Sequence, residues 1–204
     1  LISVMLSLCA GSLSEIGLKE LILQLLGRGS DMNGLILWQV RLPRTVAAIL
    51  VGSALGASGG LLQSLLRNGL AGPFLLGISA GSGLMVIMAI VLGIYLAYIP
   101  LLAWIGALLT VILVAIISNS SNGISIQKLI LSGVAISSLF GAIQSVLLLG
   151  SDDSRIQTAL QWLIGSLNSI EWGLLVICGS MIIAGLISTL FCLKSLDILN
   201  LYDS

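Results

Sequence analysis

The sequence contains no histidine, and only 8% of its 204 residues are charged. Histidine is the most common general base and transition-metal ligand in proteins, so its absence excludes every histidine-dependent catalytic triad. The eight basic and eight acidic residues cancel, which leaves no positive field to attract nucleic acid. We therefore expect no catalytic residue, no metal site, no cofactor and no nucleic-acid partner.

Cysteine and lysine are also scarce. Cys9, Cys178 and Cys192 are odd in number and embedded in apolar runs, where a free cysteine behaves as a small hydrophobe. None of the three lysines follows a glycine, so the G-x-x-x-x-G-K-[ST] loop of nucleotide-hydrolysing proteins is absent. The chain is therefore not expected to hydrolyse ATP.

Hydrophobic side chains are abundant and make up 58% of the residues. An ordinary soluble domain has roughly 25% charged residues and cannot bury so much apolar surface around one core. The expected fold is therefore all-α. We predict a polytopic bundle of transmembrane helices, in which residues 1–204 form a single membrane-spanning domain.

Long apolar runs set the expected spans, because crossing about 30 Å of hydrocarbon takes roughly 20 mostly apolar residues. Turn signals at Pro100 and in the polar segment 118–125 divide these runs. We expect about five complete spans and a partial first one, at residues 45–66, 74–99, 101–117, 126–149 and 172–193, and at residues 1–11. Since the chain starts within an apolar run and without Met, we expect it to be part of a longer protein.

Two segments between the expected spans carry charge. Residues 12–38 combine Ser14 as a helix N-cap with apolar residues at helical spacing, which predicts an amphipathic helix at the membrane interface. Residues 151–170 begin with SDDSRIQ and are expected to lie outside the membrane.

Small and polar residues recur within the expected spans. Lipid provides no hydrophobic force for helix association, so membrane helices pack through close backbone approach and interhelical hydrogen bonds. Gly52, Gly56 and Gly60 repeat every four residues, which predicts one closely packed face. Both helix packing and the lining of a translocation path stay open for these glycines and for Gln63, Asn68, Gly77, Ser79, Gly81 and Gln144.

The segment 68–83, NGLAGPFLLGISAGSG, combines the turn signals N-G and G-P with a glycine- and serine-rich run. It predicts either a broken, re-entrant segment beside a pathway or a tight turn followed by a packed helix, and we favour the second. No acidic or basic residue lies in the middle of a span, whereas ion-coupled transporters usually keep one there. Any driving energy is therefore expected to come from another polypeptide.

The same segment extends a longer motif. Residues 40–83, VRLPRTVAAILVGSALGASGGLLQSLLRNGLAGPFLLGISAGSG, resemble the signature of the FecCD type of ABC importer permease, which takes up iron–siderophore complexes, heme or vitamin B12. Residues 129–149, LILSGVAISSLFGAIQSVLLL, and 160–172, LQWLIGSLNSIEW, also agree with that family. The resemblance covers nearly the whole chain, with Gly69 standing where the family usually has proline.

This resemblance implies a permease subunit of an ATP-driven importer in the cytoplasmic (inner) membrane. Such a subunit moves an iron(III)–siderophore or related metal chelate by alternating access. The implied partners are a second permease subunit, identical or different, cytoplasmic ATPase subunits, an external substrate-binding protein and membrane lipid. Family permeases have about ten spans, so the later spans are expected to lie beyond this chain. The alternative is a non-catalytic membrane scaffold or channel-type subunit of another complex.

The resemblance also implies roles for residues near both ends of the chain. Arg41 and Arg44 would lie outside and dock acidic residues of the binding protein, because the planar arginine fork suits carboxylates. The alternative is that they only anchor a helix end at the membrane surface. Five basic residues would then lie outside and three inside, against the positive-inside rule, and that conflict stays open. The ATPase-coupling region would include Leu196, Asp197 and Leu199.

Overall fold

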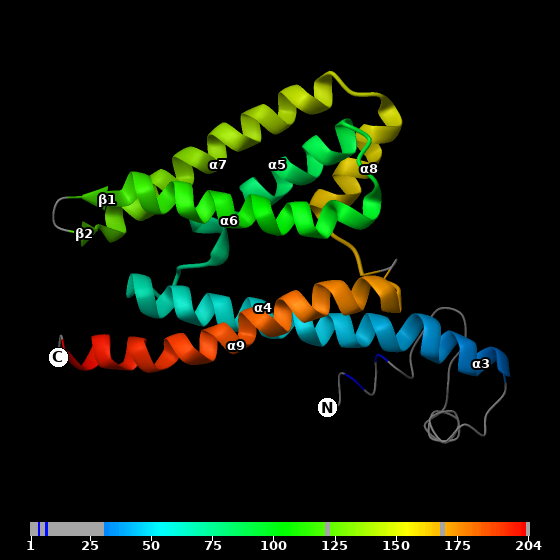
Figure 1. The fold of residues 1–204 in the computed structure, drawn as a ribbon, viewed down its shortest axis with the longest axis horizontal. Coiled ribbons are helices and arrows are strands. Elements are labelled where there is room, and N and C mark those ends of the chain that lie inside the picture. Colours follow the sequence, from blue (N-terminus) through cyan, green and yellow to red (C-terminus); the bar gives the residue numbers. More distant parts are fainter. Residues whose placement is uncertain (1–3, 5–6, 8–30, 121–122, 168–169, 203–204) are drawn as a thin grey trace. The chain divides into compact units, whose positions relative to one another are not determined.

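The computed structural model describes residues 4, 7, 31–120, 123–167 and 170–202 (Figure 1). These residues are almost entirely helical, which confirms the predicted all-α fold. The elements are α3 (Asp31–Ile36), a π-helix (Leu37–Arg41), α4 (Leu42–Leu66), a 3₁₀-helix (Pro73–Leu76), α5 (Ile78–Val91), a 3₁₀-helix (Leu96–Tyr98), α6 (Ile99–Ser118), β1 (Asn119–Ser120), β2 (Gly123–Ile124), α7 (Ile126–Leu149), α8 (Asp153–Ile164) and α9 (Trp172–Tyr202).

In the described part of the chain, four helical segments are long and apolar enough to cross a membrane. They are Gly34–Leu66, Leu96–Ser118, Ile126–Leu149 and Trp172–Phe191. The chain is therefore polytopic, as predicted. The first of these segments starts well before residue 45, because α3 and the π-helix continue into α4. Most of the interfacial helix expected at residues 12–38 lies outside the described residues.

The segment expected to form one span at residues 74–99 is not a single helix. Its helical part, α5, has 14 residues, about 21 Å of rise, which is less than the ~30 Å hydrocarbon core. Gly93, at φ +72°, ends α5 in a left-handed turn. The amide of Gly93 donates to the Ile90 carbonyl at 3.1 Å and that of Ile94 donates to the Ala89 carbonyl at 2.9 Å, the two bonds of a Schellman motif.

Pro100 was expected to mark the turn between two spans, but it lies in the first turn of α6 instead. Proline suits that position, because the amide it lacks has no intrahelical partner there and its fixed φ is helical. The reversal of the chain occurs earlier, at residues 92–95, where glycine can adopt a positive φ.

Two compact units divide the chain: residues 1–54 with 167–190, and residues 55–166 with 191–204. In the second unit, the C-terminal half of α5 supplies most of the buried core. Its apolar cluster consists of Val86, Ile87, Ala89, Ile90, Ile99 and Ala159. Figure 1 shows α5, α6 and α7 side by side, with the short β1–β2 hairpin at one end of these helices and α8 at the other.

The segment expected outside the membrane at residues 151–170 contains α8, a 12-residue helix. Ala159 is its fully buried residue, while most of the other α8 residues are partly or largely exposed. Between α6 and α7, β1 and β2 pair antiparallel, with Asn119 opposite Ile124 and Ser120 opposite Gly123.

Candidate functional site

The most closely packed part of the described chain surrounds α5. Gly81 faces α6, and a Cβ atom at this position would overlap the Thr110 hydroxyl and lie 2.9 Å from the Gly106 carbonyl oxygen. A Cβ at Gly106 would lie 2.6 Å from both the Gly81 carbonyl oxygen and the Met85 Cγ. Gly81 is thus opposite Thr110 and Gly106 is opposite Met85, so α5 and α6 run antiparallel. Their backbones touch because neither glycine has a side chain.

The residues just before α5 are similarly close to α7. Gly77 has φ +72°, and a Cβ there would lie 3.0 Å from both the Gly133 carbonyl oxygen and the Ser137 Oγ. A Cβ at Gly133 would lie 2.9 Å from the Leu76 Cα. The segment 68–83 therefore contains both features of the favoured interpretation: a turn, followed by a helix that packs closely.

A polar side chain joins the same two helices. The Nε2 of Gln144, in α7, donates a hydrogen bond of 2.8 Å to the carbonyl oxygen of Ala80, in α5. Gly83 makes room for it, since a Cβ at Gly83 would lie 3.3 Å from that nitrogen. The structure thus brings three predicted site residues, Gly77, Gly81 and Gln144, to one helix and its neighbours.

The predicted residues on α4 and nearby are arranged differently. Among the described residues, no atom lies within 4 Å of a Cβ built at Gly52, Gly56 or Gly60, and the side chains of Gln63 and Ser79 are exposed. Asn68 follows α4, and its Oδ1 accepts the Leu70 amide at 2.9 Å, a local Asx turn. The packed face predicted for the glycines of α4 stays a prediction.

Sequence reasoning missed the partners of α5 on α6. Gly106 and Thr110 are four residues apart, and the Thr110 hydroxyl donates to the Gly106 carbonyl at 2.7 Å. The sequence did contain a signal for Gly106 and Thr110. A small residue is followed four positions later by a hydroxyl residue in an otherwise apolar run, and this spacing is the same as that of the glycines on α4. A separate buried pair, Ser118 of α6 and Ser132 of α7, has its Oγ atoms 2.8 Å apart and joins these two helices directly.

Helix α8 lies along the C-terminal half of α5. Arg155 Nη1 donates to the carbonyl oxygen of Val91 at the end of α5, and Ala159 belongs to the buried cluster of α5. Leu163 Cδ2 is 3.0 Å from a Cβ built at Gly83. Since Arg155, Ala159 and Leu163 are each one turn apart, one face of α8 runs antiparallel along α5.

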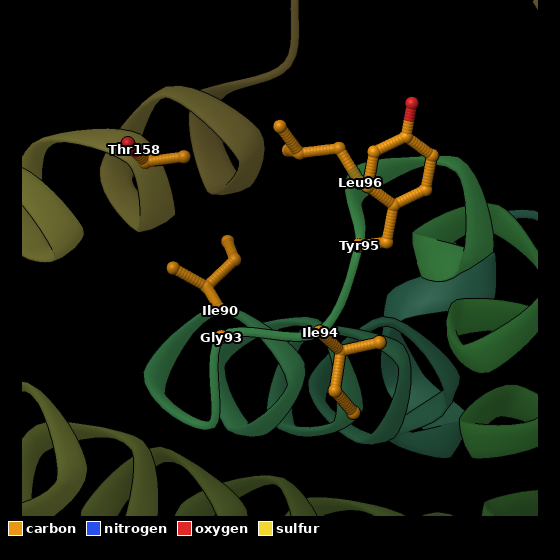
Figure 2. A pocket seen from close by; sticks show the side chains of 6 residues that line it. All are labelled: Ile90, Gly93, Ile94, Tyr95, Leu96 and Thr158. Carbon is orange, nitrogen blue, oxygen red and sulfur yellow. The ribbon is translucent and has the colours of Figure 1, made fainter.

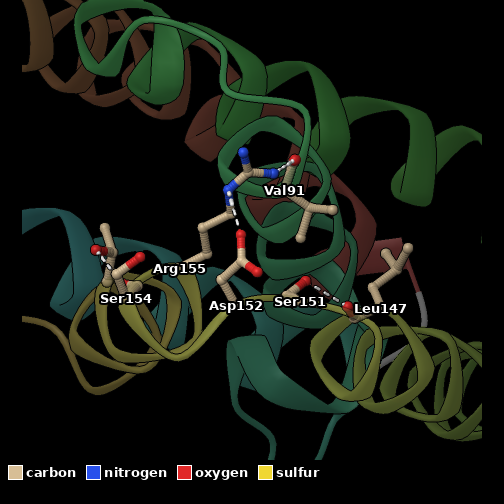
Figure 3. A network of polar contacts seen from close by, with 7 residues as sticks. Val91, Leu147, Ser151, Asp152, Ser154 and Arg155 are labelled. Carbon is tan, nitrogen blue, oxygen red and sulfur yellow. Dashed lines mark hydrogen bonds and ion pairs between the residues drawn. The ribbon is translucent and has the colours of Figure 1, made fainter.

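Figure 3 shows the polar end of this contact. The Nε of Arg155 is also 3.9 Å from an Asp152 carboxylate oxygen, with side chains 46% and 82% exposed. An ion pair this exposed contributes little. The bond to the Val91 carbonyl is the better anchor, because it satisfies one of the last carbonyls of α5 with a cation.

A small cavity lies beside this contact (Figure 2). Its volume is about 300 Å³, and its lining comes from the end of α5, the connection to α6 and one residue of α8: Ile90, Gly93, Ile94, Tyr95, Leu96 and Thr158. This volume is at the lower end of the range for small-molecule sites. The Thr158 hydroxyl already donates to the Ser154 carbonyl at 2.9 Å.

Arg41 and Arg44, the predicted docking residues, lie in the first unit, where Arg41 ends the π-helix and Arg44 is in the first turn of α4. Arg41 is only 8% exposed, and Arg44 is partly buried. Arg44 Nε donates to the Leu167 carbonyl at 3.3 Å. Close by in the sequence, Trp172 Nε1 donates to the Trp38 carbonyl at 2.7 Å. The residues around the start of α4 are thus bound to Leu167 and to Trp172, the first residue of α9.

These features define a class of protein: a multi-pass α-helical membrane protein whose helices pack through glycine and whose described spans contain no charged residue in their middle. The model of the FecCD transport family matches residues 1–204, the whole chain. The chain belongs to the FecCD transport family, and it is a multi-pass protein of the cytoplasmic membrane.

Individual relatives agree with this assignment. The hemin transport system permease protein HmuU of Yersinia pestis is 38% identical over 172 residues, which are 80% of this chain and 51% of HmuU. The vitamin B12 import system permease protein BtuC of Escherichia coli is 33% identical over 180 residues, 84% of this chain and 51% of BtuC. The chain therefore spans about half the length of the curated relatives it matches.

A solved structure is similar as well. It is described as a metal-chelate type ABC transporter in an inward-facing conformation, and it superposes with a TM-score of 0.71 at 29% sequence identity. The match covers 90% of this chain and 58% of the other. The two chains thus share a fold over the matched part.

Proposed function

We propose that this chain is part of the membrane permease of an ATP-driven importer, and that the cargo is an iron(III)–siderophore complex or a related metal chelate such as heme or a corrinoid. The observation that carries the proposal is the match of the whole chain to the FecCD transport family. Relatives named for hemin and for vitamin B12 support a bulky metal chelate as the cargo class.

The partners in this proposal are a second permease subunit, cytoplasmic ATPase subunits and an external substrate-binding protein. Two properties of the sequence support an external source of energy: the absence of a nucleotide-binding loop and the absence of acidic or basic residues in the middle of the expected spans. ATP hydrolysis is therefore assigned to a separate subunit.

Alternating access requires helices with more than one stable packing arrangement. The contacts of α5 support its involvement, because bare backbone meets backbone at Gly81 and Gly106 and one polar bond, from Gln144 to Ala80, holds α7. Where two helices meet through bare backbone, they can slide past each other, because no interlocking side chains have to change rotamer first. We assign to α5, with Gly77, Gly81 and Gln144, the role of a moving element of the pathway.

The roles implied by the family resemblance for the two arginines and for the C-terminal part of α9 remain part of this proposal. Arg44 and Arg41 are assigned to docking of the binding protein, with Arg44 as the more accessible of the two. Leu196, Asp197 and Leu199 are assigned to ATPase coupling. In the structure they lie within α9, whose helical backbone continues to Tyr202.

The direct test is transport by the full-length protein. It is reconstituted in proteoliposomes with a candidate ATPase and a candidate binding protein. Uptake of radiolabelled ferric hydroxamate, heme and cobalamin is then measured with and without ATP. We expect uptake of one of these cargoes that needs ATP and both partners. Uptake that persists without the ATPase would point to a channel-type subunit, and the absence of any uptake would favour a scaffold.

A further inference from the structure

The cavity at the end of α5 lies at one end of the membrane-spanning helices of the second unit. At the opposite end, β1 follows α6 and pairs with β2, which precedes α7. The start of the span Leu96–Ser118 and the end of the span Ile126–Leu149 therefore lie together beside the cavity (Figure 1). Because apolar spans end where the hydrocarbon core ends, the cavity is at the level of the lipid headgroups.

Two exposed tyrosines lie at the same level. Tyr95 and Tyr98, on the connection from α5 to α6, are 74% and 59% exposed, and their rings meet edge to face with centroids 6.5 Å apart. Tyrosine is enriched at membrane–water interfaces, because its ring is apolar and its hydroxyl is polar. Tyr95 also lines the cavity (Figure 2), so the cavity lies beside a side chain that suits a lipid headgroup.

The lining of the cavity suits an acyl chain. Ile90, Ile94 and Leu96 contribute apolar side chains around a volume of about 300 Å³. The hydroxyl of Thr158, which also lines the cavity, already donates to the Ser154 carbonyl within α8 at 2.9 Å. A polar ligand would lose its hydrogen bonds to water in such a cavity, whereas an apolar chain gains from burial.

Two opposite charges lie next to this cavity, one turn before Thr158 on α8. The Nε of Arg155 is 3.9 Å from an Asp152 carboxylate oxygen, and both side chains are exposed. Nη1 of Arg155 donates to the Val91 carbonyl (Figure 3). A guanidinium has more N–H donors than these two contacts use, so Arg155 can bind a phosphate while Asp152 accepts a hydrogen bond from an ammonium group.

We infer that this cavity binds an aminophospholipid of the surrounding membrane, such as phosphatidylethanolamine. One acyl chain fills the apolar cavity, the phosphate accepts hydrogen bonds from Arg155, and the primary ammonium donates to Asp152. The short ethanolamine linker suits a cation and a carboxylate that lie side by side. Since the lining comes from α5, its connection to α6 and α8, the bound lipid stabilises the attachment of α8.

The same charges discriminate between lipid classes. A choline headgroup carries a positive charge but has no N–H to donate to Asp152. A glycerol headgroup leaves the lipid with a net negative charge, which the neighbouring exposed carboxylates of Asp152 and Asp153 repel. The primary amine is therefore favoured over both.

Lipid binding to the full-length protein tests this inference. The protein is delipidated in detergent and titrated with dioleoyl phosphatidylethanolamine, phosphatidylcholine or phosphatidylglycerol, and bound lipid is measured by native mass spectrometry. We expect phosphatidylethanolamine to bind about tenfold more tightly than the other two, the gain from one charge-assisted hydrogen bond. Phosphatidylethanolamine with a photoreactive group on its acyl chain should label the peptide that contains residues 90–98.

Two matched pairs of variants test the acyl chain and the headgroup separately. Thr158→Phe fills the cavity and should weaken binding of phosphatidylethanolamine about tenfold, while Thr158→Val keeps the cavity volume and should bind like the wild type. Asp152→Asn should bring the affinities for phosphatidylethanolamine and phosphatidylcholine to within about twofold of each other. Glu171→Gln removes an exposed carboxylate before α9 and should leave the preference unchanged.

Several results would overturn the inference. They are equal affinity for the three lipids, tighter binding of phosphatidylglycerol, labelling only outside residues 90–98, and full binding by Thr158→Phe. Asp152→Asn keeps the test decisive if the phenylalanine disturbs α8, because the Asp152 side chain is 82% exposed. None of these measurements needs transport, so their failure leaves the proposed function intact, and a failure of ATP-dependent uptake leaves the lipid site intact.

Discussion

The side chain of Gln144 in α7 bonds the backbone carbonyl of Ala80 in α5 at 2.8 Å, next to a glycine, Gly83, that leaves room for it. A glutamine in an apolar span thus has a defined partner on a helix 64 positions earlier in the sequence. The bond is the one polar side-chain link between α5 and α7 that the described residues show.

Replacing this glutamine tests the strength of that link. Gln144→Leu keeps the approximate size of the side chain but removes the donor. We expect a loss of stability of about 0.6 kcal/mol, the average for interhelical hydrogen bonds in membranes, and at most about 1.7 kcal/mol. The measurement is the midpoint of denaturant unfolding in mixed micelles. The matched control is Gln63→Leu, an exposed glutamine on α4, expected to change stability by less than about 0.5 kcal/mol. Equal effects of the two variants would contradict the role of the Gln144 bond.

A methyl group added at Gly81 should be poorly tolerated. The new Cβ would overlap the Thr110 hydroxyl and lie 2.9 Å from the Gly106 carbonyl, so α5 and α6 must separate. Overpacking of this kind costs about 1–3 kcal/mol or more, which would appear as a lower thermal unfolding midpoint. Gly56→Ala is the control, since the described structure has open space there, and it should unfold within about 1 kcal/mol of wild type. A Gly56 variant as damaged as the Gly81 variant would show that a partner covers the glycines of α4.

The end of α4 contains a residue in an unfavourable backbone conformation. Arg67 has φ +47°, while its amide donates to the Ser64 carbonyl at 3.3 Å and the Asn68 amide donates to the Gln63 carbonyl at 3.1 Å. This is the Schellman position where glycine is usual. Arg67→Gly should therefore raise stability by about 1 kcal/mol, the order of the cost of a left-handed residue.

The reverse change provides the control for that prediction. Gly93 occupies the same position at the end of α5, with φ +72° and open space around it. Gly93→Ala should lower stability by a similar ~1 kcal/mol. Both variants are compared by thermal unfolding in the same detergent. If Arg67→Gly is destabilising, the contacts of the arginine side chain outweigh the backbone strain.

The attachment of α8 should depend on Arg155 much more than on Asp152. Arg155→Gln removes the cation from the end of α5 and should cost about 1 kcal/mol, since the group is half exposed. Asp152→Asn should cost less than ~0.5 kcal/mol, because its ion pair is exposed and long. Unfolding midpoints at low and high salt test this, with the Asp152 effect vanishing at high salt.

Docking at Arg44 should be electrostatic. Arg44→Glu should weaken binding of the external partner severalfold at low ionic strength, with a smaller effect at high salt. Binding is measured by surface plasmon resonance on nanodiscs of the full-length protein. Arg67→Glu, at the opposite end of α4, is the control and should leave affinity unchanged. Unchanged affinity in the Arg44 variant would remove the docking assignment.

Several parts of the fold were predictable because they depend on local chemistry. The apolar runs at 126–149 and 172–193 are long enough for a span, and both are helical in the structure. The expected turn after Asn68 also forms, since an asparagine followed by glycine closes a turn with its own side chain. These outcomes need no partner elsewhere in the chain.

Other parts depended on contacts that a linear pattern does not contain. The run at 74–99 has enough apolar residues for a span, yet Gly93 ends α5 early. Pro100, which was expected to separate two spans, lies in the first turn of α6 instead. The glycine spacing of α4 and that of Gly77 and Gly81 look alike in sequence. Only the structure shows that α6 and α7 lie against the second set.

The amino-acid sequence by itself determined that this is a helical protein of the membrane and a member of its transport family, because hydrophobic length, missing charge and the motif at residues 40–83 are properties of contiguous residues. The tertiary structure decided which glycines touch another backbone, which glutamine finds a carbonyl and which carbonyl Arg44 binds. The physical reason is separation along the chain: these contacts join residues 25 to 123 positions apart, and only folding brings them together.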